Sequence, residues 1–198
     1  MRYAILSLFL AALATAATVT PSIPPGKAVG SATAPIQLEV FSDFQCPSCK
    51  MLYEEALKPL MNDYVSTGKI YLIHRDFPLQ MHAHSREAAS YANASARVNK
   101  YEQVSAALFR TQTTWAADGK IDSALTGVLT PAEMTKVKAL LNDKTVASEM
   151  TQDMALGQQR NVRQTPSMFV THKGRTYPIT GAVKYDILRK FLDDLLSK

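Results

Sequence analysis

The sequence has few cysteines: Cys46 and Cys49 are the only two in 198 residues. Neither lies near the N-terminal leader described below, so lipid attachment at the leader is excluded. Runs of lysine or arginine are also missing, and the scattered cations behind the formal net charge of +5 indicate a solvated basic surface, not a nucleic-acid-binding face. After the leader no segment is long and apolar enough to span a bilayer, and no internal repeat is visible.

The N-terminus has the layout of a secretory signal peptide. Arg2 precedes a short apolar run, and Ala14 and Ala16 are small residues at the two positions that a signal peptidase reads. A transmembrane anchor is the alternative, but the run is shorter than the roughly 20 apolar residues that span a bilayer. We therefore expect residues 1–16 to be cleaved and the protein to be exported to the periplasm or another extracytoplasmic space, where disulfides persist.

The pattern after the leader changes from linker to strand, helix and strand. Residues 17–34 are rich in Pro, Gly, Ser, Thr and Ala without periodicity, which predicts a flexible linker. The alternation in IQLEVF (36–41) predicts a strand, apolar spacing after Cys46 predicts a helix that ends at Gly68, and KIYLIHRDF (69–77) predicts a second strand. This order favours a right-handed parallel unit.

The second half of the chain is helical first and then returns to strands. Residues 81–163 are rich in alanine and amphipathic, which predicts an almost wholly helical segment. SMFVTHKGRTYPIT (167–180) predicts a hairpin that turns at 173–174, and an amphipathic helix follows it. The expected architecture is an α/β domain in two pieces, 35–80 and 164–198, that holds the helical segment as an insertion.

The CPSC motif at 46–49 allows three interpretations. As a structural crosslink, its short loop would stabilise the fold by only about 2 kcal/mol, less than a longer loop would. As a zinc or copper site it supplies two of the four ligands that zinc needs, and His82 and His84 fit better as exposed polar residues than as the missing pair. A redox pair explains the position best, because the motif lies at a strand-to-helix junction.

In the redox interpretation Cys46 is the N-cap of the helix. Pro47 takes the first helical position, where its missing N–H costs nothing. The N–H groups of Ser48 and Cys49 and the helix dipole would then stabilise a Cys46 thiolate. The dipole contributes at most about 2 kcal/mol, which lowers a thiol pKa from about 8.5 to about 7. We expect Cys46 to be the exposed nucleophile and Cys49 the inward-facing resolving thiol.

Four stretches resemble, in the same order, parts of the DsbA-like thiol-disulfide oxidoreductases of the thioredoxin superfamily. They are VFSDFQCPSCK (40–50), HRDFPL (74–79), TPSMFV (165–170) and GAVKYDILRKFLDDLL (181–196). The resemblance implies a thioredoxin-like fold with a helical insertion domain between the second and third core strands. We expect the redox-active disulfide Cys46–Cys49 to serve without any other cofactor, and no residue to bind a metal.

The resemblance assigns further roles near the cysteines. Pro166 resembles the family's cis-proline, which faces the cysteine pair, and a cis X-Pro bond is uncommon and usually deliberate. An extended substrate peptide is then expected to pair with the backbone of Thr165. Pro47 and Ser48, at the start of the helix, are the other expected substrate-binding residues.

Two further expectations concern Glu39 and Ser48. Glu39 shares a strand face with Phe41 and resembles the family's buried acid below the cysteine pair, where burial would raise its pKa and let it relay the Cys49 proton. Strongly oxidising members often carry histidine immediately before the second cysteine, whereas this chain has Ser48. Serine carries no positive charge, so the motif leaves the oxidising strength open.

These observations predict an exported thiol-disulfide oxidoreductase that introduces disulfides into secreted proteins through a mixed disulfide with Cys46. The expected partners are unfolded or reduced secreted proteins and, from the resemblance alone, a quinone-coupled membrane enzyme that re-oxidises the pair. We expect a monomer that binds no nucleic acid. The alternatives are a reductase or isomerase of the same fold, although 17–34 is too short for the dimerisation domain that isomerases generally need, and a metal- or peptide-binding chaperone module.

Overall fold

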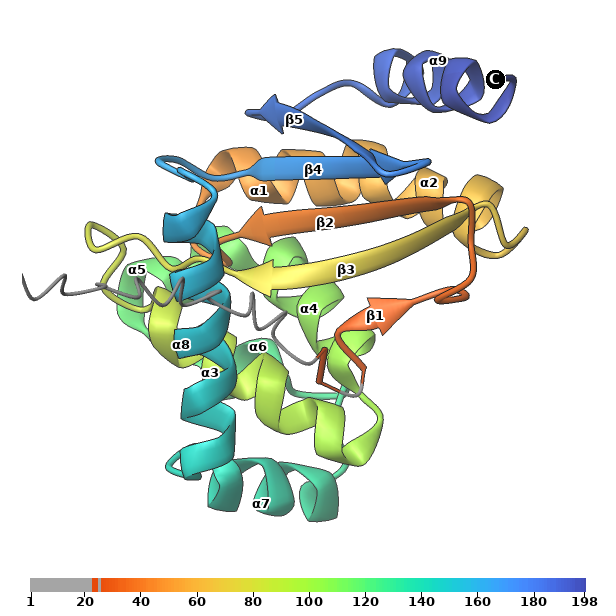
Figure 1. Ribbon diagram of the computed structural model, residues 1–198. Helices are drawn as coiled ribbons and strands as arrows, with labels where there is room; N and C mark the ends of the chain where they lie inside the picture. Colours follow the sequence, from red (N-terminus) through yellow and green to blue (C-terminus); the bar gives the residue numbers. More distant parts are fainter. Residues whose placement is uncertain (1–22, 25) are drawn as a thin grey trace, which may run out of the picture.

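The computed structural model describes residues 23–24 and 26–198, which form a five-stranded sheet packed against helices (Figure 1). The strands are β1 (Ala28–Val29), β2 (Ile36–Ser42), β3 (Ile70–Asp76), β4 (Ser167–His172) and β5 (Arg175–Thr180). The helices are α1 (Pro47–Leu52), α2 (Lys58–Leu60), α3 (Ser85–Ser95), α4 (Tyr101–Arg110), α5 (Gln112–Asp118), α6 (Ile121–Ala124), α7 (Pro131–Leu140), α8 (Lys144–Gln159) and α9 (Tyr185–Leu196). The predicted signal peptide, 1–16, lies outside the described residues.

The sheet has the strand order β1-β3-β2-β4-β5. β2 and β3 are parallel, with Val40 opposite His74 and Ser42 opposite Asp76, so the predicted parallel unit is confirmed. β4 runs antiparallel to both β2 and β5. The β4–β5 hairpin turns at 173–174 as predicted, where Gly174 has a positive φ of 74°.

The helix that follows Cys46 runs from α1 to Val65 and twice changes to π-helical geometry, in η1 (Tyr53–Leu57) and η2 (Met61–Val65). The N–H of Lys58 bonds to the carbonyl of Tyr53, five residues earlier. Pro59 has no N–H to donate, so the regular i to i−4 ladder cannot continue through it. The helix therefore accommodates the proline between two widened turns.

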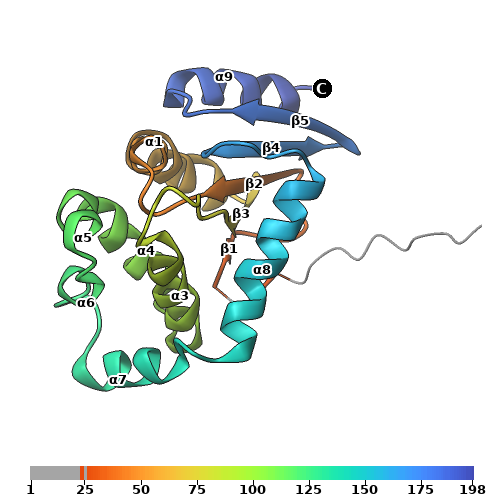
Figure 2. The same cartoon turned by 90° about the vertical axis from the view of Figure 1, so that its left-hand side faces the viewer.

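The two faces of the sheet carry different helices (Figure 2). Because side chains alternate along a strand, Ile36, Leu38 and Val40 point into the main core with α1, η1, α2 and α9. Phe41 points to the other face, where it packs with Phe77 and with Leu156 of α8. The thioredoxin-like α/β fold is therefore confirmed, with α3 to α8 inserted between β3 and β4.

The insertion begins with α3 and ends with α8, and it includes the short 3-10 turn η3 (Ala96–Val98). These helices lie within the predicted range, 81–163. Figure 2 shows α3 to α7 gathered below the sheet, while α8 leads the chain back along one face of it. No helix in the part of the chain that the structure describes is both long and apolar enough to cross a membrane.

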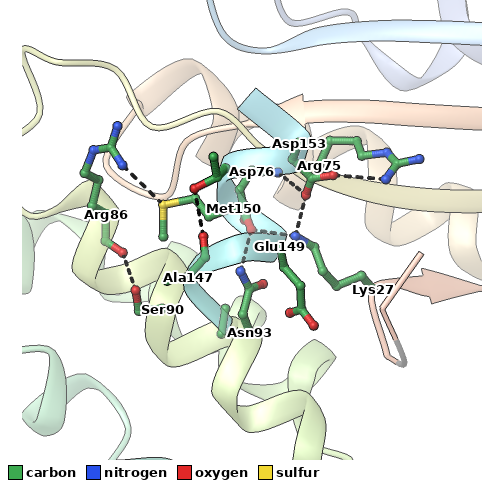
Figure 3. A network of polar contacts seen from close by, with 12 residues as sticks. Lys27, Arg75, Asp76, Arg86, Ser90, Asn93, Ala147, Glu149, Met150 and Asp153 are labelled. Carbon is green, nitrogen blue, oxygen red and sulfur yellow. Dashed lines mark hydrogen bonds and ion pairs between the residues drawn. The ribbon is translucent and has the colours of Figure 1, made fainter. Parts of the chain in front are cut away.

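The prediction of a flexible linker over 17–34 is wrong for its described second half. Lys27 is completely buried, and its Nζ donates to the carboxylates of Asp76 and Asp153 at 2.5 and 2.6 Å (Figure 3). Its carbonyl accepts from the His74 N–H at 2.8 Å. Composition indicated a linker, but one lysine that meets two buried carboxylates fixes this segment against the fold, since a buried charge needs partners.

The next residues of this segment are also held in place. β1 pairs with β3, with Ala28 opposite Ile73 and Val29 opposite Leu72. Gly30 has a φ of 97°, and a Cβ there would come within 2.6 Å of the Ile70 carbonyl oxygen. Only glycine permits this close approach of two backbone segments.

Candidate active site

The cysteine motif lies where β2 passes into α1 (Figure 1). Cys46 is the N-cap, in an extended conformation, and Pro47 opens the helix as predicted. The Cys46 N–H donates to the Asp43 carbonyl at 3.1 Å, and its own carbonyl accepts from the N–H groups of Cys49 and Lys50. The junction thus fixes both thiols at one end of the central strand.

Both cysteines are free thiols and both are buried. Cys46 is 7 % exposed and Cys49 1 % exposed, so Cys46 is the more accessible thiol but is not the exposed residue that the sequence predicted. The difference arises from two segments distant in the chain. Thr165 brings its carbonyl oxygen to 3.5 Å from the Cys46 sulfur, and Gln112 bonds to the Cys46 carbonyl.

Hydrogen bonding lowers the pKa of Cys46 to about 5, against an ordinary value of 9.0. The largest cause is the hydrogen bond from the Cys49 thiol, and the Thr165 side chain also lowers it, while burial acts in the opposite direction. The N–H groups of Cys49 and Ser48 contribute less, and the sulfur makes no regular N-cap hydrogen bond. The value of about 7 expected from the sequence was for the helix dipole alone, and the further decrease comes from hydrogen bonds whose geometry the fold fixes.

The pKa of Cys49 moves the other way. Burial raises it well above the ordinary value, and the hydrogen bond to Cys46 and the charge there raise it further. Hydrogen bonding with Ser42 and with the Asp43 N–H, which lies 3.5 Å from the sulfur, only partly offsets this. The pair therefore divides into a thiolate at Cys46 and a protonated thiol at Cys49.

The residues predicted to bind substrate meet beside the Cys46 sulfur. The Thr165–Pro166 peptide bond is cis, as predicted, and proline leaves no N–H at this point of the chain. Pro47 and Ser48 are exposed at the start of α1. Pro47 and Ser48 thus follow Cys46 directly on the accessible α1 side, and the Thr165 carbonyl, which precedes the cis bond, lies 3.5 Å from the Cys46 sulfur.

Glu39 is buried as predicted, but its surroundings differ from the expectation. One carboxylate oxygen accepts from Arg75 Nε and Nη2 at 3.1 and 2.9 Å, and the other accepts from Arg160. With Phe41 it faces α8, whereas Cys49 packs in the core on the α1 side, because strand residues alternate between faces. Both carboxylate oxygens of Glu39 are therefore engaged in ion pairs with arginines.

Asp43, which the sequence analysis missed, organises the junction. Its Oδ1 accepts from the Gln45 N–H at 2.8 Å and from the Ser85 hydroxyl. Its Oδ2 accepts from the Leu79 N–H at 2.8 Å and meets His82 Nδ1 at 2.7 Å. His82 is therefore bound to a carboxylate and is not the free surface residue expected. An acid three positions before Cys46 was the only local signal.

Two glutamines join the junction to the insertion. Gln112 Nε2 donates to the carbonyls of Phe44 and Cys46 at 2.7 and 3.0 Å. In return, Gln45 Nε2 donates to the Ala116 carbonyl at 3.1 Å. Among residues 23–24 and 26–198, no three His, Cys, Asp or Glu side chains converge in a way that would hold a metal ion.

Comparison with known proteins gives consistent matches over nearly the whole chain. A family model described as Thioredoxin matches residues 22–194. Disulfide bond formation protein D of Bacillus subtilis (strain 168) is 26% identical over 186 residues, which are 89% of this chain and 80% of that protein. A probable disulfide bond formation protein D of Bacillus cereus is 22% identical over 177 residues, or 87% and 79% of the two chains.

Solved structures show the same fold. Wolbachia pipientis alpha-DsbA1 superposes with a TM-score of 0.71 at 20% identity, over 85% of this chain and 89% of that one. Oxidised BdbD from Bacillus subtilis superposes with a TM-score of 0.67 at 22% identity, over 87% of this chain and 93% of that one.

Proposed function

Because the chain belongs to the thioredoxin family and is a DsbA-like thiol-disulfide oxidoreductase, we propose that it introduces disulfides into reduced proteins outside the cytoplasm. The observation that supports oxidation of the substrate by this protein is the difference between the pKa values of the two thiols. Cys46 has a pKa of about 5, while the pKa of Cys49 is raised well above its ordinary value. A stable Cys46 thiolate favours the reduced form of the protein, and this makes the disulfide form an oxidant.

The reaction begins with the Cys46–Cys49 disulfide. A substrate thiolate attacks the Cys46 sulfur, the Cys46–Cys49 bond breaks, and its electron pair stays on Cys49, which takes up a proton. A second substrate thiolate then attacks the substrate sulfur of the mixed disulfide. Cys46 leaves as a thiolate, so the substrate has lost two electrons and the protein holds them as a dithiol.

The low pKa of Cys46 sets the scale of the driving force. A pKa of about 5 lies two units below pH 7, which favours the dithiol by at most about 2.7 kcal/mol, or roughly 60 mV, before solvent screening. Ser48 supplies no positive charge, and the largest contribution to the low pKa of Cys46 is the hydrogen bond from the Cys49 thiol. We expect Thr165 and Pro166 to receive the substrate as an extended segment, with Pro47 and Ser48 on its other side.

The experiment that tests this function is the equilibrium potential of the cysteine pair against glutathione. A value near −120 mV would establish an oxidant, and a value near −270 mV would identify a reductase instead. The purified disulfide form should oxidise a reduced, unfolded substrate protein stoichiometrically, and Cys46→Ser should not. A disulfide that cannot be reduced while the protein is folded would reject thiol exchange altogether.

The proposed setting is an extracytoplasmic compartment with a quinone-coupled membrane enzyme that restores the disulfide, and with the protein acting as a monomer. The leader predicted over 1–16 supports export. Fractionation of cells that express the full chain tests the location. Membranes supplied with quinone should re-oxidise the reduced wild-type protein, and quinone-free membranes are the control.

A further inference from the structure

A small polar cavity of about 10 Å³ lies between the central strands and α4. Ser42 of β2 and His74 of β3 line it from the sheet, and Tyr101 and Ser105 line it from α4. This volume is close to the smallest that accommodates one water molecule, which also needs two or more polar partners. The cavity therefore has the size and the lining of a single-water site.

Three polar atoms at this place have no hydrogen-bond partner among the described residues. They are His74 Nε2, Ser105 Oγ and Glu102 Oε2, and all three are buried. His74 is 7 % exposed and Ser105 1 % exposed. Buried polar groups without a partner are rare and destabilising, so three of them together indicate a function or a bridging water.

The same groups connect the inner cysteine to the solvent. Ser42 lines the cavity, and its side chain is among the groups that lower the pKa of Cys49. His74 Nε2 lies 3.6 Å from Glu102 Oε2, and the Glu102 side chain is 34 % exposed. The line from thiol to surface therefore runs through Ser42, the cavity and His74 to Glu102, on the α1 side of the sheet. Glu39, with both oxygens bound by arginines, faces the other side.

We infer that this cavity is the proton route of Cys49, with His74 as the group that takes the proton from the cavity water and returns it. This rests on the proposed thiol exchange. When the dithiol is re-oxidised, Cys49 passes its proton by way of Ser42 and the water to His74, and attacks the Cys46 sulfur of the mixed disulfide. The partner's sulfur leaves with the electron pair. When substrate is oxidised, the same path returns a proton to the Cys49 thiolate.

The electrostatic surroundings keep His74 neutral. Burial lowers the pKa of His74, and Lys27 lowers it further, while Glu102 of α4 and Asp76 of β3 raise it. Tyr101 packs against the ring with centroids 5.7 Å apart, and Arg75 also lines the cavity. The imidazole is therefore neutral near pH 7 and can accept a proton, whereas Cys49 on its own resists ionisation because burial raises its pKa.

A disulfide reagent that releases a coloured thiol allows the reactions of the two cysteines to be measured as separate kinetic phases. The reduced protein reacts with 5,5′-dithiobis(2-nitrobenzoate) in two phases: Cys46 attacks first and forms a mixed disulfide, and Cys49 then displaces the second 5-thio-2-nitrobenzoate. The second phase reports Cys49 deprotonation. We expect His74→Gln to slow this phase about tenfold or more and to change its pH dependence, with the first phase unchanged. Ser105→Val, which fills the cavity, should act in the same way.

His172→Gln is the matched control. His172 is also a buried histidine with an unpartnered Nε2, but it pairs with Ile36 at the opposite end of β2, and both phases should keep their wild-type rates. Wild-type second-phase kinetics in both His74→Gln and Ser105→Val would overturn the inference. A tenfold loss in Glu39→Gln in place of His74→Gln would return the role to Glu39. A wild-type protein without a first phase would instead reject the proposed function.

Discussion

Replacement of Cys49 by alanine removes the donor that contributes most to the low pKa of Cys46. A hydrogen bond to a charged group contributes about 1.5–3 kcal/mol, and one pKa unit corresponds to 1.36 kcal/mol. The loss should therefore raise the Cys46 pKa by about 1–2 units, from about 5 to between roughly 6 and 7. The Ser48 N–H and the Thr165 side chain remain, so the pKa should not return to its ordinary value.

Cys49→Ser is the matched variant, because its hydroxyl keeps a hydrogen-bond donor at the same position. Both variants contain Cys46 as their only thiol, so each titration has a single transition. The ultraviolet absorbance of the thiolate measured against pH gives the pKa, and the pH dependence of alkylation by iodoacetamide gives it independently. We expect the serine variant to titrate about one unit or more below the alanine variant.

Equal pKa values in the two variants would refute this reasoning. In that case the backbone N–H groups at the start of α1 and the Thr165 side chain would carry the whole effect, and the contribution of Cys49 would be negligible. A Cys46 pKa near 9 in both variants would reject the lowered pKa itself. Urea unfolding of each variant confirms that the compared proteins are equally folded.

Three further outcomes follow from the packing and the charges. Lys27→Met should destabilise the protein by about 3–5 kcal/mol at pH 7, because two buried carboxylates lose their cation. In urea unfolding, the difference in stability between variant and wild type should become smaller at acidic pH, as Asp76 becomes protonated. A loss below about 1 kcal/mol at pH 7 would contradict this prediction. Gly157→Ala should cost about 1–3 kcal/mol in the same measurement, since the new Cβ would lie 2.6 Å from the Phe77 ring, and a wild-type stability would show that the ring moves aside freely. Because folding lowers the pKa of Cys46, ionisation of this thiol stabilises the reduced protein fully above about pH 9 and not below about pH 5. The melting temperature of the reduced protein, relative to that of Cys46→Ser, should therefore increase as the pH rises between these values.

Much of the active site was predictable because its geometry is local. Cys46 at a strand end and Pro47 at the first helical position depend on a few neighbouring residues, as does the hairpin turn at 173–174 at the far end of the sheet. The cis bond before Pro166 was predicted from the resemblance, since proline alone does not distinguish cis from trans. Alternation along β2 correctly placed Glu39 on the same face as Phe41.

The sequence did not show which helices cover each face of the sheet. Glu39 was expected below the cysteines, but the fold places α8 and Arg160 on its side of the sheet. On the Cys49 side of the sheet the fold instead places His74 and the polar cavity. In the sequence, His74 is only one residue of an ordinary predicted strand. The cause in each case is the packing of a helix that joins the sheet from a distant part of the chain.

The sequence by itself determined the pair of thiols, the junction that holds them and the strands on either side, because caps, alternation and spacing act over short distances along the chain. The tertiary structure decided the electrostatics. Lys27 finds its two carboxylates 49 and 126 positions away, and the Cys46 sulfur meets Thr165 across 119 positions. A buried charge is stabilised only by groups brought into contact, and which groups those are depends on the packing of the whole domain.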